Sequence, residues 1–146
     1  MQTYGFHFHG YMNGSKKPIK RQYYFSDTET LTKGDVLNGD TTGTVREVDL
    51  AVSGDTAILG VADETKSGTD STTQIWVILD LNGQGIWRVY DANARAEGTV
   101  LDIDGTTGAM TLAADSDSDV IVVANSTADE PTLVRFHPTA YGWEDA

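Results

Sequence analysis

The chain contains no cysteine, so disulfide bonds, thiolate metal sites and cysteine nucleophiles are excluded. Prolines number only three, and no apolar run approaches the ~20 residues of a membrane helix. The sequence also lacks a nucleophilic serine between glycines, a phosphate-binding Gly-Lys-Thr loop and a dinucleotide fingerprint. These absences favour a protein that is not an enzyme, uses no cofactor and has no membrane as a partner.

Glycine, β-branched residues and acidic residues dominate what remains. The 146 residues include 15 glycines and are enough for one domain with a sizeable core. Eleven short runs rich in Val, Ile, Thr and aromatic residues are separated by Gly, Asn, Asp and Ser. They predict an all-β fold, a compact β-sandwich or β-barrel-like body of short antiparallel strands. The expected strands are residues 4–12, 19–25, 35–37, 44–52, 57–62, 73–81, 85–90, 99–103, 109–113, 119–124 and 132–137.

Local patterns add detail to this prediction. Residues 44–52 alternate between apolar and polar, as a strand with one face in water does. Residues 73–81 are apolar at both parities, which predicts a strand covered on both faces or facing a partner subunit. Asn82-Gly83 predicts a hairpin between the two strands that carry Trp76 and Trp87. Asp104-Gly105 and Gly108 mark a second hairpin, and residues 63–71 are expected to form an exposed loop.

Charge is distributed unevenly along the chain. The net charge is −12, yet residues 1–25 hold four basic residues and no acidic residue. Residues 26–146 hold the other six basic residues and all 22 acidic residues, a net charge of −16. Such an acidic body repels the phosphate backbone, so we expect no nucleic acid partner. We therefore divide the chain into a basic, aromatic-rich N-terminal arm, residues 1–25, and an acidic all-β domain, residues 26–146.

The arm is the strongest candidate for a binding segment. Seven of the 13 aromatic residues lie within it, together with four of the ten basic residues. Aromatic and arginine side chains are enriched at interface cores, and an extended arm can add a strand to a neighbour's sheet. Equally, these aromatics could pack into the body's own core. The candidate contacts to a capsid or a neighbouring subunit are Tyr4, Phe6, Phe8, Tyr11, Lys16, Lys17, Lys20 and Arg21.

Two patterns suggest metal sites. His7 and His9 are two residues apart, so on a strand they share a face and can chelate a metal. Small barrel metalloenzymes have a carboxylate four or five residues later, where this chain has Asn13 and Gly14. A metal-dependent enzyme that uses His7, His9 and His137 is therefore a weak alternative. The histidines would make binding by the arm sensitive to pH, because imidazole titrates near neutrality.

The second pattern is a run of alternating aspartates, Asp115, Asp117 and Asp119. A calcium loop that starts at Asp115 needs glycine at its sixth position and glutamate at its twelfth, and here these are Val120 and Ser126. The run is more typical of a solvated turn, and a surface calcium site stays open.

Four glycine-centred stretches resemble the opening of the small capsid decoration proteins of tailed bacteriophages, also called head auxiliary or cement proteins. They are Gly34-Asp35-Val36-Leu37, Gly43-Thr44-Val45, Ala51-Val52 and Ile58-Leu59-Gly60-Val61-Ala62. The later stretches Trp87-Arg88-Val89-Tyr90-Asp91-Ala92 and Val120-Ile121-Val122-Val123-Ala124-Asn125 also look like such proteins. The resemblance covers roughly residues 30–137 and leaves the arm unmatched.

The resemblance implies a non-enzymatic protein, made in the host cytoplasm, on the outer surface of the virion. Its partner would be the major capsid protein of a tailed phage. Proteins of this type usually form homotrimers that bridge capsomers of the mature head and stabilise the shell against DNA pressure. The main alternative is a carbohydrate-binding β-sandwich of a phage fibre or adhesin, in which Trp76, Trp87 and Trp143 stack on sugars.

Overall fold

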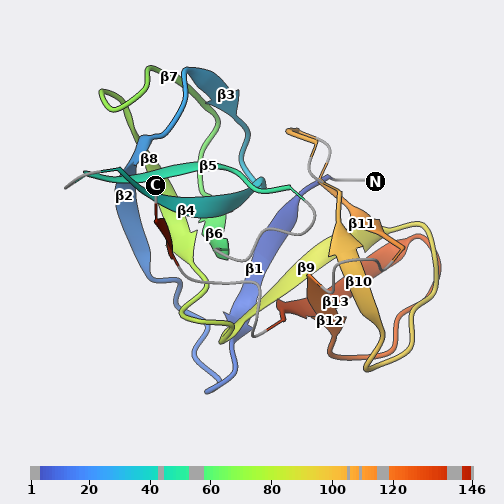
Figure 1. The fold of residues 1–146 in the computed structure, drawn as a ribbon. Coiled ribbons are helices and arrows are strands. Elements are labelled where there is room, and N and C mark those ends of the chain that lie inside the picture. The colour runs from blue at the N-terminus through green and yellow to red at the C-terminus, as the bar shows by residue number, and fades with distance from the viewer. Residues whose placement is uncertain are drawn as a thin grey trace.

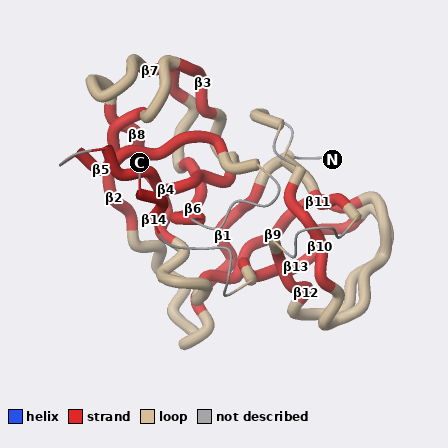
Figure 2. Tube along the Cα trace, in the orientation of Figure 1, coloured by secondary structure: helices blue, strands red, loops and turns tan. Residues whose placement is uncertain are grey.

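The computed structural model describes residues 4–42, 45–52, 58–104, 106–108, 110–114, 119–137 and 143–145. Within these ranges the chain forms fourteen strands and no helix, which confirms the predicted all-β class (Figure 2). The strands build an antiparallel sheet, a small barrel and a two-stranded ribbon. Figure 1 shows the barrel and the sheet on either side of the first strand, β1, Phe6–Tyr11.

The six-stranded sheet has the order β1-β9-β13-β12-β10-β11, and each neighbouring pair is antiparallel. Buried and more exposed residues alternate along its strands, as in β9, where Trp87 and Val89 are buried and Arg88 is exposed. One face of the sheet therefore covers a core and the other faces outward. The strands are β1, β9 (Gly85–Asp91), β13 (Glu130–Phe136), β12 (Val120–Val122), β10 (Val100–Ile103) and β11 (Leu112–Ala113).

The barrel closes because β6 pairs with β8 on one side and with β4 on the other. Two of its strand pairs are parallel rather than antiparallel: β2 with β5, and the added strand β14 with β4. A ribbon of β3 and β7 lies beside the barrel (Figure 1). These strands are β2 (Lys20–Phe25), β4 (Val36–Thr42), β5 (Val45–Leu50), β6 (Ile58–Ala62), β8 (Gln74–Leu79), β14 (Trp143–Asp145), β3 (Glu29–Leu31) and β7 (Lys66–Gly68).

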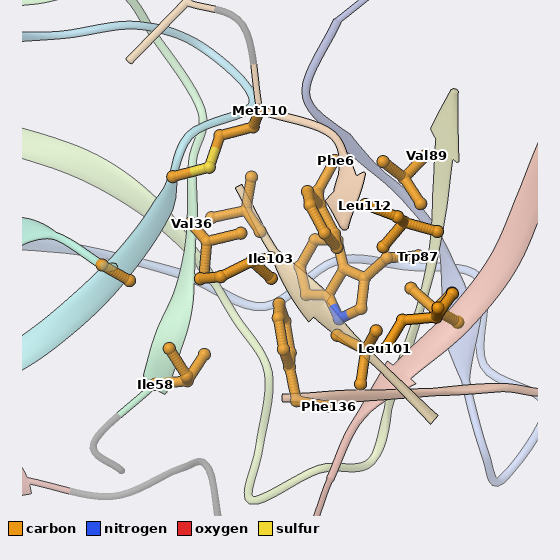
Figure 3. Packing of buried hydrophobic residues seen from close by; sticks show 14 of the residues in the cluster. Phe6, Val36, Ile58, Trp87, Val89, Leu101, Ile103, Met110, Leu112 and Phe136 are labelled. Carbon is orange, nitrogen blue, oxygen red and sulfur yellow. The ribbon is translucent and has the colours of Figure 1, made fainter. Parts of the chain in front are cut away.

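Two hydrophobic clusters hold the fold together. The larger cluster lies between the inner face of the sheet and residues of the barrel strands, such as Val36 and Ile78. At its centre, Phe6 stacks on Phe136 at 5.6 Å between ring centroids, and Trp87 is fully buried (Figure 3). The smaller cluster fills the barrel and consists of Phe25, Leu31, Leu37, Val48, Ala62, Ile75, Val77 and Leu79. The larger cluster therefore contains side chains from both halves, and its burial joins the sheet to the barrel.

All eleven predicted strands are present, and three strands were not predicted. The ribbon strand β7 lies inside residues 63–71, which we expected to form a loop, and β3 and β14 are the other two. Strand β5 also differs from expectation. Its Glu47, assigned to the water-facing side, is buried and accepts a hydrogen bond from the Ser71 hydroxyl, whereas Val52 just after the strand is half exposed.

The predicted hairpin at Asn82-Gly83 is wrong, although the turn itself is present. Leu81, Asn82 and Gly83 all have positive φ, at 55°, 58° and 79°. However, β8 belongs to the barrel and β9 to the sheet, so this turn connects the two halves of the molecule instead of pairing its flanking strands. The predicted hairpin around Gly108 is confirmed, because β10 and β11 pair in antiparallel fashion.

Residues 4–25 contribute one strand to each half. Strand β1 pairs with β9 at the edge of the sheet, and β2 pairs with both β5 and β8 in the barrel. The boundary placed after residue 25 therefore coincides with the end of a barrel strand. Whether this segment also contacts a neighbouring subunit stays a prediction.

The Gly34-Asp35 motif lies where the two halves meet. A Cβ on Gly5 would lie 2.9 Å from Cα of Gly34, so the two backbones touch at a distance that requires glycine. The buried Asp35 carboxylate accepts hydrogen bonds from the backbone N–H of Thr32, at 2.8 Å, and of Gly108, at 3.0 Å, and from the Thr107 hydroxyl. This motif thus joins the start of β4 to the β10–β11 connection.

Candidate docking surface

The histidine pair lies on β1 without a ligand set. His7 and His9 are half-buried, and Nε2 of His7 lies 3.2 Å from the carbonyl oxygen of Tyr4. Across the described ranges, no three side chains of His, Asp or Glu come close enough to hold a metal ion. A metal-dependent enzyme therefore has no assembled site among these residues.

The aspartate run is only partly described, because Asp115 and Asp117 lie outside the described residues. Asp119 is buried, and its carboxylate accepts the backbone N–H of Ile103 at 2.9 Å. This carboxylate therefore joins the start of β12 to β10, a structural role that a solvated turn would not give it.

The tryptophans differ in their exposure. Trp87, a candidate for sugar stacking, is fully buried and donates its indole N–H to Asp80 at 2.9 Å. Trp76, on a strand expected to be covered on both faces or to face a partner subunit, is 43% exposed on the outside of the barrel. A sugar cannot stack on Trp87, whereas Trp76 stays accessible to one; the side chain of Trp143 lies outside the described residues.

The eight candidate contact residues divide by exposure. Phe6 and Tyr11 are buried in this chain's own core, and Phe8 is half-buried with its ring edge on Trp87. A buried side chain cannot touch a partner unless the fold opens, so the surface for contacts is formed by the others. These exposed residues are Tyr4, Lys16, Lys17, Lys20 and Arg21.

Burial of Tyr11 positions the loop that carries the cations. Its hydroxyl donates a hydrogen bond to the carbonyl of Leu79 at 2.9 Å and accepts the N–H of Ile19 at 3.0 Å. Burial raises the pKa of Tyr11, so the hydroxyl keeps its proton for the first of these bonds. The β1–β2 connection is therefore fixed to the end of β8.

An apolar groove of about 460 Å³ opens beside this connection, where β2 begins and β8 ends. Arg21 and Tyr23 line it from β2, and Leu59 and Leu79 line it from β6 and β8. Burial raises the pKa of Tyr23, and the nearby Arg21 and Arg46 partly offset that rise. The complete lining is Ile19, Arg21, Tyr23, Ile58, Leu59, Leu79, Leu81 and Asn82.

The turn that bears Leu81 and Asn82 is held by the buried carboxylate of Asp80. This carboxylate accepts the N–H of Gly83 at 2.6 Å and the indole N–H of Trp87 at 2.9 Å. Burial raises the pKa of Asp80 to about 6, against the opposing effect of its hydrogen bonds. The wall of the groove thus depends on one buried acid.

Two connections far apart in sequence form this surface together. The N–H of Met12 bonds the carbonyl of Gln84 at 2.7 Å, and the β1–β2 and β8–β9 connections lie at the same end of the molecule in Figure 1. Three of the exposed large apolar residues, Met12, Ile19 and Leu81, are here, at 48%, 46% and 37% exposure. We call the set Met12, Lys16, Lys17, Ile19, Lys20, Arg21 and Leu81, with the groove, the docking end.

Sequence reasoning found the cations of the docking end and missed its apolar part. Leu81 is a large apolar residue directly before Asn-Gly, a place where turns are usually polar, and this was the one available signal. Ile19 was assigned to a strand, and nothing in the sequence placed it beside Leu81.

No family model and no curated protein matches the sequence. The fold is similar to a crystal structure of the N base of the head fiber gp8.5 of bacteriophage phi29, with a TM-score of 0.53 and 13% identity. The match covers 84% of this chain and 98% of that one, and at this identity it shows the fold alone. Among the described residues, no helix is long and apolar enough to cross a membrane.

Proposed function

We propose that this chain is a non-enzymatic protein of a tailed-phage head, which binds the outside of the mature shell through the docking end. The observation that carries the proposal is the docking end itself. It combines an apolar groove with Lys16, Lys17 and Arg21 on a chain whose net charge is −12. The fold's likeness to a head fiber base and the resemblance to decoration proteins both point to the phage head.

Charge gives the chain an orientation on a shell. Lys16, Lys17 and Arg21 lie in or next to the β1–β2 connection, Lys20 pairs with Asp63 at 2.9 Å, and residues 26–146 carry −16. A cationic end attracts an acidic partner surface, and an acidic remainder is repelled by the packaged DNA and favours the exterior. The partner would then be the major capsid protein, with the virion surface as the location.

Stabilisation of the shell is the finer part of the proposal. A small docking end supplies a modest affinity, so several protomers acting together would bind far more tightly than one. A homotrimer that bridges capsomers would have this avidity and would resist outward pressure from DNA. The same arrangement also suits the base of a fibre, which must stay attached under lateral force.

Co-sedimentation with heads that lack this protein tests the function. The wild-type chain should bind the heads saturably and raise the temperature at which they release DNA. Arg21→Glu combined with Leu81→Asp should weaken binding by about tenfold or more, because it places two charges at the groove. Lys66→Glu, on β7 of the ribbon, changes charge away from the docking end and is the matched control.

Two results would count against the proposal. The first is an absence of wild-type binding to expanded heads. The second is equal binding by the control and the double variant, which would reject the docking end as the contact. Analytical ultracentrifugation of the free protein tests the trimer separately.

A further inference from the structure

The outward face of the six-stranded sheet carries a second basic surface. Strand alternation places His7 on this face opposite Arg88, and Arg88 opposite Leu133 on β13. The bulge between Phe8 and Gly10 keeps His9 on the same side, close to Arg88. We call His7, His9, Arg88, Leu133 and Arg135 the histidine face.

Like charges surround His9. Nζ of Lys16 lies 3.8 Å from the position of a Cβ on Gly10, the next residue, and Arg88 pairs with His7 across from β1. The pKa of His9 is lowered by burial first, then by Lys16 from the β1–β2 connection and by Arg88 from β9. Positive groups from two elements thus meet at one point on an acidic protein. Lys16 also belongs to the docking end, so the two basic surfaces adjoin each other.

Carboxylates do little to balance these charges. Strand alternation places Asp102 on the same side, but Asp102 and Asp119 are both buried, and Asp119 already accepts the N–H of Ile103. Asp129 stands at the margin, where it accepts the hydroxyl of Tyr90 at 3.0 Å. Among the described residues of this face, Arg88 is therefore exposed and Arg135 half-buried, and the exposed acid Asp104 lies only after the end of β10, at the far edge of the sheet.

Apolar side chains lie among the cations. Ile86 on β9, Leu133 on β13 and Ile121 on β12 are all half-buried on the outward side. Ile121 lies opposite Arg135, so apolar and basic residues alternate across neighbouring strands. Apolar residues beside arginine are typical of interface cores.

We propose that the histidine face binds an acidic surface of the head shell and takes up a proton as it does so. This inference rests on the proposed function, because it assigns a second contact with the same partner. Charge complementarity selects the partner's chemistry: carboxylates beside apolar residues match Lys16, Arg88 and Leu133.

The proton follows from electrostatics at His9. In the free protein Lys16 and Arg88 disfavour the imidazolium. Carboxylates placed beside these cations would neutralise them and raise the pKa of His9 towards or above its usual value. A group whose pKa rises on binding takes up protons, so affinity falls as pH increases through that pKa.

The test is co-sedimentation with heads that lack this protein, at low salt and at two pH values, about pH 6 and about pH 8. Arg88→Glu should weaken binding by about tenfold or more at both, whereas Lys66→Glu should stay within about twofold of wild type. The wild-type chain should bind several-fold more tightly at the lower pH, and His9→Asn should remove most of that difference. Arg88 is exposed, so its variant should keep the wild-type circular dichroism spectrum.

The outcomes separate the two proposals. If Arg88→Glu binds like the control while the docking-end variant fails, the docking end alone makes the contact and the histidine face is rejected. Loss of the pH dependence in Lys66→Glu, or its persistence in His9→Asn, would reject the proton uptake. If the wild-type chain binds no heads, both the proposed function and this inference are rejected.

Discussion

Replacing Asp80 with asparagine should remove the contribution of one titrating group to the pH dependence of the free energy of unfolding. Asp80 is fully buried between the barrel and the sheet, and burial raises its pKa from 3.8 to about 6. A nearby arginine, Arg135, and hydrogen bonds from Gly83, Gly85 and Trp87 lower the pKa in part. The folded state therefore binds a proton at Asp80 more tightly than the unfolded state does.

The sign follows from this difference in proton binding. Because the folded pKa is higher than the unfolded one, ionisation above about pH 6 costs the folded state free energy, and protonation below it restores that energy. At about pH 7 the shift of about two units corresponds to about 3 kcal/mol. Between about pH 7 and about pH 5, the free energy of unfolding should rise by about 1 kcal/mol through Asp80.

Asparagine changes this in two ways. It has no charge at either pH, so the gain on acidification disappears. Its amide NH₂ also faces a donor, the N–H of Gly83 or the indole of Trp87, which leaves that donor unsatisfied at a cost of about 1–3 kcal/mol. At about pH 7 asparagine avoids the cost of about 3 kcal/mol of the buried charge but leaves one donor unsatisfied, so Asp80→Asn should be about as stable as wild type or somewhat more stable. At about pH 5 the wild-type protein regains about 1 kcal/mol that the variant does not, so the gap between their free energies of unfolding should shift by about 1 kcal/mol in favour of wild type.

Urea unfolding at both pH values measures the gap between the free energies of unfolding of the variant and the wild type. Glu29, whose pKa is raised to about 7 by burial and then by Asp27, Asp49 and Asp35, also stabilises the fold on acidification. Both proteins retain Glu29, so its contribution cancels in the difference. Glu97→Gln, an exposed charge removal, is the control and should show a constant gap. A gap for Asp80→Asn that is equal at the two pH values would refute the raised pKa.

Three further predictions concern packing. Gly60→Ala should cost about 3 kcal/mol in urea unfolding, because the new Cβ would lie 2.0 Å from the carbonyl oxygen of Ile78; a near-neutral result would show that β6 shifts freely. Trp87→Ala should cost about 4 kcal/mol and Trp76→Ala less than about 1 kcal/mol, since only the former is buried; equal losses would contradict the assigned faces. Asp35→Ala should cost about 2 kcal/mol and speed proteolysis near Gly108, whose N–H it binds, whereas an unchanged cleavage rate would show that the loop is held by other contacts.

The sequence was sufficient to predict strands but not their partners. Runs such as residues 85–90 and 132–137 alternate clearly, because each has one buried face, and they appear at the expected positions. Strand β7, with the sequence Lys-Ser-Gly, has no such signal and is a strand only because it pairs with β3. The Asn82-Gly83 pattern predicted a turn correctly, yet a turn of positive φ can join paired strands or strands of different sheets.

The docking end, like the strand pairing, could be predicted from the sequence only in part. Its cations are consecutive enough to be found by charge counting, whereas Ile19 and Leu81 are about sixty positions apart and meet only because Tyr11 joins their elements. Likewise, the aromatic residues of the first 25 positions are divided between core and surface, and Tyr4 differs from Phe6 because it precedes β1 and follows a different path at Gly5, where φ is 93°. Phe6 is buried, Tyr4 is half exposed, and composition alone gives both the same expectation.

Burial removes part of the chain's acidic side chains from the surface. Six acidic residues of the described ranges are buried, and three of them, Asp35, Asp80 and Asp119, accept backbone N–H groups that join separate elements. Part of the negative charge is therefore structural and absent from the surface. By contrast, Lys16, Lys17, Lys20, Arg21 and Arg88 are all exposed. The difference in surface charge between the basic end and the rest of the molecule thus depends on where each cation lies more than on the net charge. Single charge reversals such as Arg21→Glu and Arg88→Glu therefore test the two proposed contacts most directly.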